Sequence, residues 1–237
     1  METLLTIVLI HGAGLGVSVW KDTERQLGVE TVSIEFPTMN AKADQNKNTT
    51  FDGYMTSAKK QIDLTGKSKL VIVAHSVGGV VGVELAKYYA DRMIGFVAIG
   101  AVIPEPGQSF VSTMPFPQNY ILPFIMKFGG TKPPSSAIRK GLCNDLTTEK
   151  CNAVVENFTA ESMELFTHKI TSEVVVPNKL YVHLSLDKEL SPSMQKQMSS
   201  NLGTQEIVTL ESGHLPMLST PDQLATILNK FIIRIKK

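Results

Sequence analysis

The chain has 237 residues, a length that fits one compact domain with a sizeable core. Its 23 basic and 22 acidic side chains leave a net charge of +1, which excludes a broad basic surface for nucleic acid. Hydrophobic residues make up 43% of the chain and charged residues 19%, a balance typical of a globular protein and not of a disordered or membrane-spanning one.

Two cysteines, Cys143 and Cys151, are too few for a disulfide framework and lack the spacing of a metal site, so we expect reduced thiols and no metal. The first residues lack the basic segment and the cleavage site of a signal peptide. The apolar run from Leu4 to Ile10 is too short to span a bilayer. These features predict a cytoplasmic protein without a membrane partner.

Short apolar runs alternate with helical periodicity along most of the chain, the pattern of strand–helix units on a mostly parallel sheet. A helix is expected after the third strand, where Gly79 and Gly82 would let it approach the sheet closely. The last helix is expected to begin with Thr220 as N-cap, Pro221 at the first position and Gln223 in a capping box. The predicted strands span residues 4–10, 31–36, 70–74, 94–99, 180–186 and 206–210.

One segment interrupts this alternation. From Pro104 to Pro177 the chain holds eight of its 12 prolines and six of its ten phenylalanines, with no long strand pattern. We expect an inserted helical cap at about 104–176, lying over the carboxyl ends of the strands, where open α/β sheets bind ligands. The core then comprises 1–103 and 177–237, and cap and core form a single α/β domain.

Ser76 lies between the third predicted strand and the helix that follows it. A serine on such a sharp turn exposes its hydroxyl at the sheet edge, and the turn requires small residues two positions before and after the serine. Ala74 and Gly78 meet that requirement, although the alanine replaces the usual glycine. Ser76 is therefore the candidate nucleophile.

A nucleophilic serine needs a base, and a carboxylate that orients the base. After a turn of this kind the acid precedes the histidine in the chain. Asp187 follows the strand at 180–186 and His214 follows the strand at 206–210, so we expect both on the same rim as Ser76. The remaining histidines are expected to be structural, namely His11, His75, His168 and His183. Two less favoured acids stay open, Glu105 and Asp145.

Acyl transfer also requires N–H donors for the oxyanion. The expected donors are the backbone N–H of Val77, directly after the nucleophile, and that of Ala13, in the glycine-rich loop after the first strand. This loop is a poor match to a dinucleotide-binding motif, because the last glycine of that motif would fall on Val17. No cofactor is expected.

Together these motifs resemble those of α/β-hydrolases, and more narrowly those of the small esterase and hydroxynitrile-lyase group that includes plant methylesterases. The resemblance covers nearly the whole chain outside the cap. It implies the α/β-hydrolase fold with a helical cap, no cofactor, a Ser76–His214–Asp187 triad, and Ala13 and Val77 as oxyanion donors. The segments that carry it are His11-Gly12-Ala13 with Gly16 and Trp20, residues 75–79, Asp187-Lys188, and the most specific string, residues 214–224.

Two departures favour ester hydrolysis over lyase chemistry. The lyases of this group carry a lysine soon after the catalytic histidine, where this chain has Leu215 and Pro216. The lyases that resemble this chain also carry a threonine in the first loop, where this chain has Gly12.

Phenylalanines and methionines of the cap are expected both to form its core and to line an apolar pocket. We predict a serine carboxylesterase acting on small to medium lipophilic esters, as a monomer or homodimer. A lactonase or amidase on the same triad, or a receptor-like binder with slow turnover, stays open, since fold does not determine function. The residues expected around the substrate are Gly12, His75, Phe110, Met114, Phe124 and Leu215.

Overall fold

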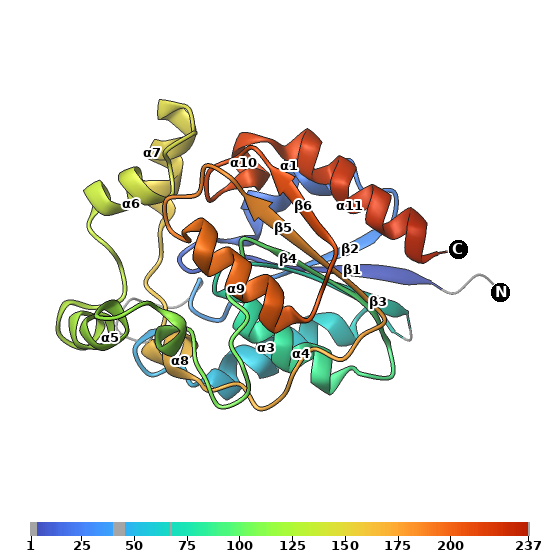
Figure 1. The fold of residues 1–237 in the computed structure, drawn as a ribbon, viewed down its shortest axis with the longest axis horizontal. Helices are drawn as coiled ribbons and strands as arrows, with labels where there is room; N and C mark the ends of the chain where they lie inside the picture. Colours follow the sequence, from blue (N-terminus) through green and yellow to red (C-terminus); the bar gives the residue numbers. More distant parts are fainter. Residues whose placement is uncertain (1–3, 40–45, 67, 237) are drawn as a thin grey trace.

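The centre of the computed structural model, which describes residues 4–39, 46–66 and 68–236, is a six-stranded sheet with the order β2-β1-β3-β4-β5-β6 (Figure 1). All five pairs of neighbouring strands in it are parallel. The mostly parallel α/β architecture is thus confirmed, with strand ends within two residues of the prediction. The strands are β1 (Leu5–Ile10), β2 (Glu30–Ile34), β3 (Lys69–His75), β4 (Met93–Ile99), β5 (Asn178–Leu184) and β6 (Ile207–Leu210).

Helices cover both faces of this sheet, because successive strand residues point to opposite sides and both sides are apolar. One cluster includes Val8 and Ile72 and packs against α3 (Phe51–Asp63), α4 (Gly78–Tyr88) and α9 (Pro192–Leu202). The other includes Ile7 and Val71. It packs against η1 (Val17–Trp20), α10 (Pro216–Ser219) and α11 (Pro221–Ile235), with α1 (Lys21–Glu24) alongside α11.

The chain between β4 and β5 forms helices and loops at the carboxyl ends of the strands, on the left in Figure 1. The division into a core and a cap at about 104–176 stays a prediction. Across the described ranges, no helix is long and apolar enough to cross a membrane. The helices of this segment are η2 (Val111–Thr113), α5 (Gln118–Gly129), α6 (Ser135–Gly141), α7 (Thr148–Asn157) and α8 (Met163–Thr167).

The close packing of α4 on the sheet depends on glycine. A Cβ at Gly79 would overlap the backbone carbonyl oxygen of Val102, which cannot move without displacing the chain after β4. We therefore expect Gly79→Ala to lower the free energy of unfolding by about 3 kcal/mol, the upper end for overpacking. Urea unfolding measures this. Gly28→Ala is the control, since a Cβ there meets nothing within 4 Å; equal stability of the two variants would contradict the packing argument.

Two expectations about local structure are wrong. Cys143 and Cys151 are joined by a disulfide and are not reduced thiols, because the turn between α6 and α7 brings their Cα atoms to 5.4 Å, within disulfide range. The helix α11 begins at Pro221 as expected, but Thr220 makes no N-cap hydrogen bond. Thr220 also ends the preceding α10, and its hydroxyl donates back to the Pro216 carbonyl oxygen at 3.4 Å.

Candidate active site

Ser76 stands on a strained turn between β3 and α4. Among the described residues it is the only non-glycine residue with a positive φ, +54°, a conformation that costs about 1–3 kcal/mol and is typical of functional positions. The carbonyl oxygen of Ser76 accepts hydrogen bonds from the Gly79 and Val102 N–H groups, both at 3.0 Å, which hold the turn. A Cβ at Gly78 would lie 2.6 Å from the His11 carbonyl oxygen, which explains the need for a small residue there.

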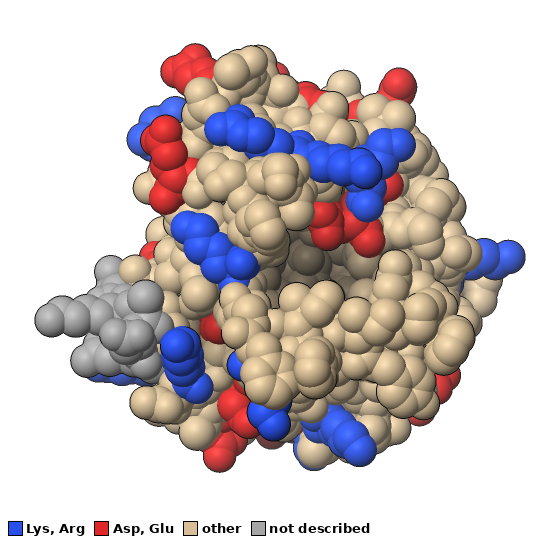
Figure 2. Space-filling model, turned by 90° about the vertical axis from the view of Figure 1, so that its left-hand side faces the viewer, with Lys and Arg blue, Asp and Glu red and all other residues tan. Residues whose placement is uncertain are grey.

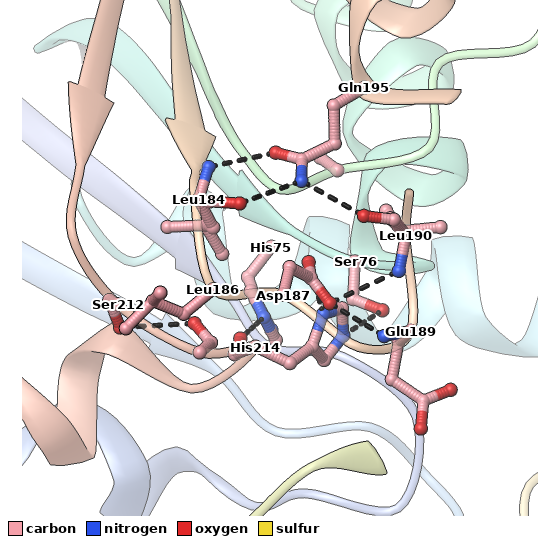
Figure 3. Close-up of polar contacts among 12 residues, drawn as sticks. His75, Ser76, Leu184, Leu186, Asp187, Glu189, Leu190, Gln195, Ser212 and His214 are labelled. Carbon is pink, nitrogen blue, oxygen red and sulfur yellow. Dashed lines mark hydrogen bonds and ion pairs between the residues drawn. The ribbon is translucent and has the colours of Figure 1, made fainter. Parts of the chain in front are cut away.

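Ser76, His214 and Asp187 come together at this rim of the sheet (Figure 3). The Ser76 hydroxyl lies 3.0 Å from His214 Nε2, and His214 Nδ1 lies 2.8 Å from Asp187 Oδ2. His214 is 3% exposed and the Asp187 side chain is fully buried. A serine hydroxyl, an imidazole and a carboxylate in this order form the arrangement that activates a nucleophilic serine.

The loop after β5 holds the Asp187 carboxylate in place. Its Oδ1 accepts hydrogen bonds from the backbone N–H groups of Glu189 at 2.7 Å and Leu190 at 3.1 Å, leaving Oδ2 for His214. Gln195 of α9 braces the same loop, bonding both backbone groups of Leu184 and the Leu190 carbonyl oxygen. The role of Gln195 was not predicted, because a glutamine in a polar helix is typical of an exposed position.

Burial and charge set the protonation of the pair. Burial opposes the charged form of His214, but the Asp187 carboxylate outweighs it, and Glu189 adds to the effect, so the pKa of His214 lies above its ordinary value of 6.5. Burial likewise opposes the charged form of Asp187, yet His214 and the two backbone N–H groups bring the pKa of Asp187 below its ordinary value. Asp187 is therefore the carboxylate of the pair, and His214 is the group that gains and loses a proton.

The other histidines and carboxylates that were alternatives for the base and the acid make different contacts. His75 donates through Nε2 to the His214 carbonyl oxygen at 2.7 Å, and burial lowers the pKa of His75 to about 3, so its imidazole is neutral. Burial also lowers the pKa of His11 to about 4. The exposed Glu105 accepts from Gln108, and Asp145 accepts from the Gly213 N–H at 2.5 Å. Asp145 thereby supports the loop that carries His214.

Of the two histidines farther along the chain, His168 directly follows α8 and stacks on Phe51 of α3, with ring centroids 3.5 Å apart. His183 is part of β5. Neither makes a hydrogen bond to Ser76 or Asp187 within the described ranges.

Ala13 and Val77, whose backbone N–H groups are the predicted oxyanion donors, both line the cavity that contains Ser76. Within the described ranges, neither backbone N–H has a protein acceptor, so both are available to a ligand. Gly12 holds the first loop against the nucleophile, since a Cβ there would lie 2.9 Å from the Ser76 Cβ.

A cavity of about 510 Å³ opens above Ser76 and is visible as a hollow in Figure 2. Its wall is mainly apolar and comes largely from the segment between β4 and β5. Four of the residues expected around the substrate line it, namely Gly12, His75, Phe110 and Met114. Two others do not: Phe124 is 67% exposed on the outer side of α5, and Leu215 is fully buried in the core. The expectation for these two residues is wrong. Phe124 faces outward because the rotation of α5 about its axis depends on how the helix docks, and Leu215, which directly precedes α10, packs into the core.

Two charged side chains of the cavity wall were not predicted. Lys132 donates through Nζ to the Phe158 carbonyl oxygen at 2.6 Å. Glu189 lies beside the triad, and partial burial raises the pKa of its carboxyl, with Asp187 adding to the rise although His214 opposes it. No group of three or more His, Cys, Asp or Glu side chains suited to a metal ion occurs in the described parts of the chain.

A buried carboxylate ties the segment between β4 and β5 to the first loop. Glu161, 3% exposed, accepts from the Gly14 N–H at 3.2 Å through Oε1, and from the hydroxyls of Thr38 at 2.5 Å and Tyr54 at 2.8 Å through Oε2. Burial raises the pKa of Glu161, and the three hydrogen bonds partly offset this. Because Gly14 follows Ala13, Glu161 positions the loop that carries one expected oxyanion donor.

We expect Glu161→Ala to lower kcat about tenfold to 100-fold with little change in KM, since a misplaced oxyanion donor weakens transition-state binding. Glu161→Gln keeps one acceptor oxygen and is expected to restore part of the loss. Steady-state kinetics of the two variants measure kcat and KM separately. An equal rise in KM for both, with kcat unchanged, would contradict a positioning role for Glu161.

Comparison with known proteins assigns the family. The model of the alpha/beta hydrolase family matches residues 7–227, nearly the whole chain. The protein belongs to the α/β-hydrolase family, and its sheet, helices and strained serine turn are those of that fold.

Individual relatives are distant but cover almost the full length. Methylesterase 17 of Arabidopsis thaliana is 24% identical over 96% of this chain and 91% of its own. Norfluorocurarine synthase 1 of Strychnos nux-vomica is 23% identical over 94% and 93%. Among solved structures, an extracellular α/β-hydrolase from a Paenibacillus species superposes with a TM-score of 0.83, at 22% identity over 95% of this chain and 98% of the other. These likenesses establish the shared fold.

Proposed function

We propose that this protein is a serine carboxylic-ester hydrolase with Ser76 as nucleophile, His214 as general base and acid, and Asp187 as the orienting carboxylate. The observation that carries the proposal is the unbroken chain of contacts from Ser76 Oγ through both His214 nitrogens to Asp187 Oδ2, at 3.0 and 2.8 Å. The methylesterase among its relatives supports ester hydrolysis as the reaction class.

In this mechanism Ser76 Oγ attacks the ester carbonyl carbon while its proton passes to His214 Nε2. The oxyanion that forms accepts hydrogen bonds from the Ala13 and Val77 N–H groups. Protonated His214 then gives its proton to the departing alcohol oxygen, which leaves an acyl group on Ser76. Water, deprotonated by His214, attacks the acyl carbon, and the carboxylic acid departs as Ser76 Oγ regains the proton.

The cavity wall favours lipophilic substrates of small to medium size. Side chains such as Phe110, Met114 and Phe166 face a space of about 510 Å³, and burying apolar surface there releases about 25 cal/mol per Å². A chain-length series of p-nitrophenyl esters, with lactones and amides of similar size, tests this assignment. The proposal predicts turnover of esters above the other classes. Stoichiometric acylation without steady-state turnover would instead indicate a receptor-like binder, and contradict it.

The pH dependence of hydrolysis follows from His214. His214 acts as a base only when neutral, so kcat/KM is expected to fall as the pH falls through the pKa of His214, which lies above 6.5. Because the Glu189 carboxylate contributes to that raised pKa, Glu189→Gln should move the acid limb to lower pH. Glu173→Gln, at an exposed position, is the control. A pH–rate profile in which both variants match the wild type would contradict this coupling.

A cytoplasmic location and a monomeric or homodimeric state stay predictions. The Cys143–Cys151 disulfide stands against the first, because such bonds persist mainly in oxidising compartments. Non-reducing peptide mapping of the native protein measures whether the pair is oxidised.

A further inference from the structure

The helix α5 presents a stripe of exposed aromatic side chains. Four aromatic residues recur at every fourth position, so they share one face of the helix and its lead-in. Their rings contact one another in pairs, with centroids 6.2 Å apart for Phe116 and Tyr120 and 4.6 Å apart for Phe124 and Phe128. The exposed fractions are 82% for Phe116, 72% for Tyr120, 67% for Phe124 and 70% for Phe128. Together these four residues are called the aromatic face below.

This face lies next to the mouth of the active-site cavity. The other side of α5 lines the cavity, with Leu122, Ile125 and Met126 in its wall. Ile125 is 54% exposed as well, so it lies at the rim and connects the cavity to the outer surface. Figure 2 shows a broad uncharged surface directly below the hollow, on the side where α5 lies in Figure 1.

The segment that carries the aromatic face has charges of one sign. The sequence from Pro106 to Asn144 contains no aspartate or glutamate. It contains four basic residues, all exposed: Lys127, Lys132, Arg139 and Lys140. Lys127 is on α5 itself, with Nζ 5.7 Å from the centre of the Phe128 ring. Exposed aromatic side chains beside cations, without nearby acidic residues in the segment, are typical of helices that lie in the interface of an anionic bilayer.

We propose that the aromatic face docks on the surface of an anionic lipid bilayer, with α5 lying in the interface plane. The aromatic rings then enter the boundary between headgroups and acyl chains while the basic side chains contact lipid phosphates. Resting on the proposed function, this places the cavity mouth where lipophilic esters concentrate. A second copy of the chain fits the face less well, because two-fold pairing through α5 would bring together two segments that each carry basic residues and no acidic ones. The expectation of no membrane partner was based only on the lack of a segment long enough to span a bilayer.

Co-sedimentation of the full chain with phosphatidylcholine vesicles, with and without phosphatidylglycerol, tests the proposal. We expect the protein to pellet with the anionic vesicles and less as salt increases. The double variant Tyr120→Ser/Phe128→Ser should bind the anionic vesicles at least about tenfold more weakly than the wild type. Lys127→Glu should also weaken binding, but by less than the double variant. The matched control is Leu64→Ser/Val175→Ser, which removes side chains that are 85% and 82% exposed away from α5.

Three results would overturn the proposal. The first is wild-type protein that stays in the supernatant with anionic vesicles at low salt. The second is binding by Tyr120→Ser/Phe128→Ser equal to that of the wild type, with thermal unfolding showing that the variant is folded. The third is a wild-type dimer, seen by light scattering without lipid, that the same variant converts to a monomer. None of these readouts uses ester hydrolysis, so the docking proposal can fail or stand independently of the proposed function.

Discussion

Ser76→Ala is expected to lower kcat/KM for ester substrates by at least about 10⁴-fold, because the acyl-enzyme route requires the Oγ that His214 deprotonates. The fold should be retained, since alanine carries the same Cβ on the same strained turn and the hydrogen bonds that hold the turn come from the backbone. Steady-state hydrolysis of a p-nitrophenyl ester, with circular dichroism of the purified variant, measures both effects.

The matched control for this variant is Ser136→Ala, which removes an exposed serine hydroxyl in α6. It should leave kcat/KM unchanged. Adding His214→Ala to Ser76→Ala should cost little more, because the two side chains act as one unit. A Ser76→Ala protein that is folded and still turns over esters at a rate near that of the wild type would exclude the triad mechanism.

Asp187→Asn is expected to lower kcat/KM at neutral pH by about 10³- to 10⁴-fold while leaving the site intact. The reason lies in the donors around the carboxylate. Oδ1 accepts from the Glu189 and Leu190 N–H groups, so the oxygen of an asparagine must occupy that position and its NH₂ must face His214 Nδ1. His214 then accepts at Nδ1 and carries its proton on Nε2, where it cannot take the proton of Ser76.

The same substitution removes the charge that raises the pKa of His214, so the acid limb of the pH–rate profile should move to lower pH. Glu105→Gln is the control, since Glu105 is the alternative acid of the sequence analysis and lies on the surface. Loss of activity in Glu105→Gln as large as in Asp187→Asn would assign the acid elsewhere.

Much of the fold was predictable because buried parallel strands leave a local pattern. The apolar runs before Ser76, Asp187 and His214 located three strand ends, and parallel strands bring their carboxyl ends to one edge of the sheet. The serine turn was predictable from its own small neighbours. These local patterns therefore predicted that Ser76, Asp187 and His214, although far apart in the sequence, lie close together at one edge of the sheet.

The features that were missed depend on tertiary contacts that leave no local pattern. The Cys143–Cys151 disulfide requires the turn between α6 and α7, and the buried network of Glu161 joins residues more than 100 positions apart, such as Tyr54. The helix α5 is apolar on both its cavity side and its outer side, so periodicity could not show that Ile125 faces the cavity rim and Phe124 faces outward.

Covalent labelling with a serine-directed fluorophosphonate, followed by peptide mapping, identifies the nucleophile itself, since an activated serine displaces the fluoride far faster than an ordinary hydroxyl does. We expect one phosphonyl group per chain, attached to Ser76, with loss of hydrolysis in proportion to labelling and much slower labelling of His214→Ala. A label on another residue, or full inhibition with Ser76 unmodified, would contradict this expectation.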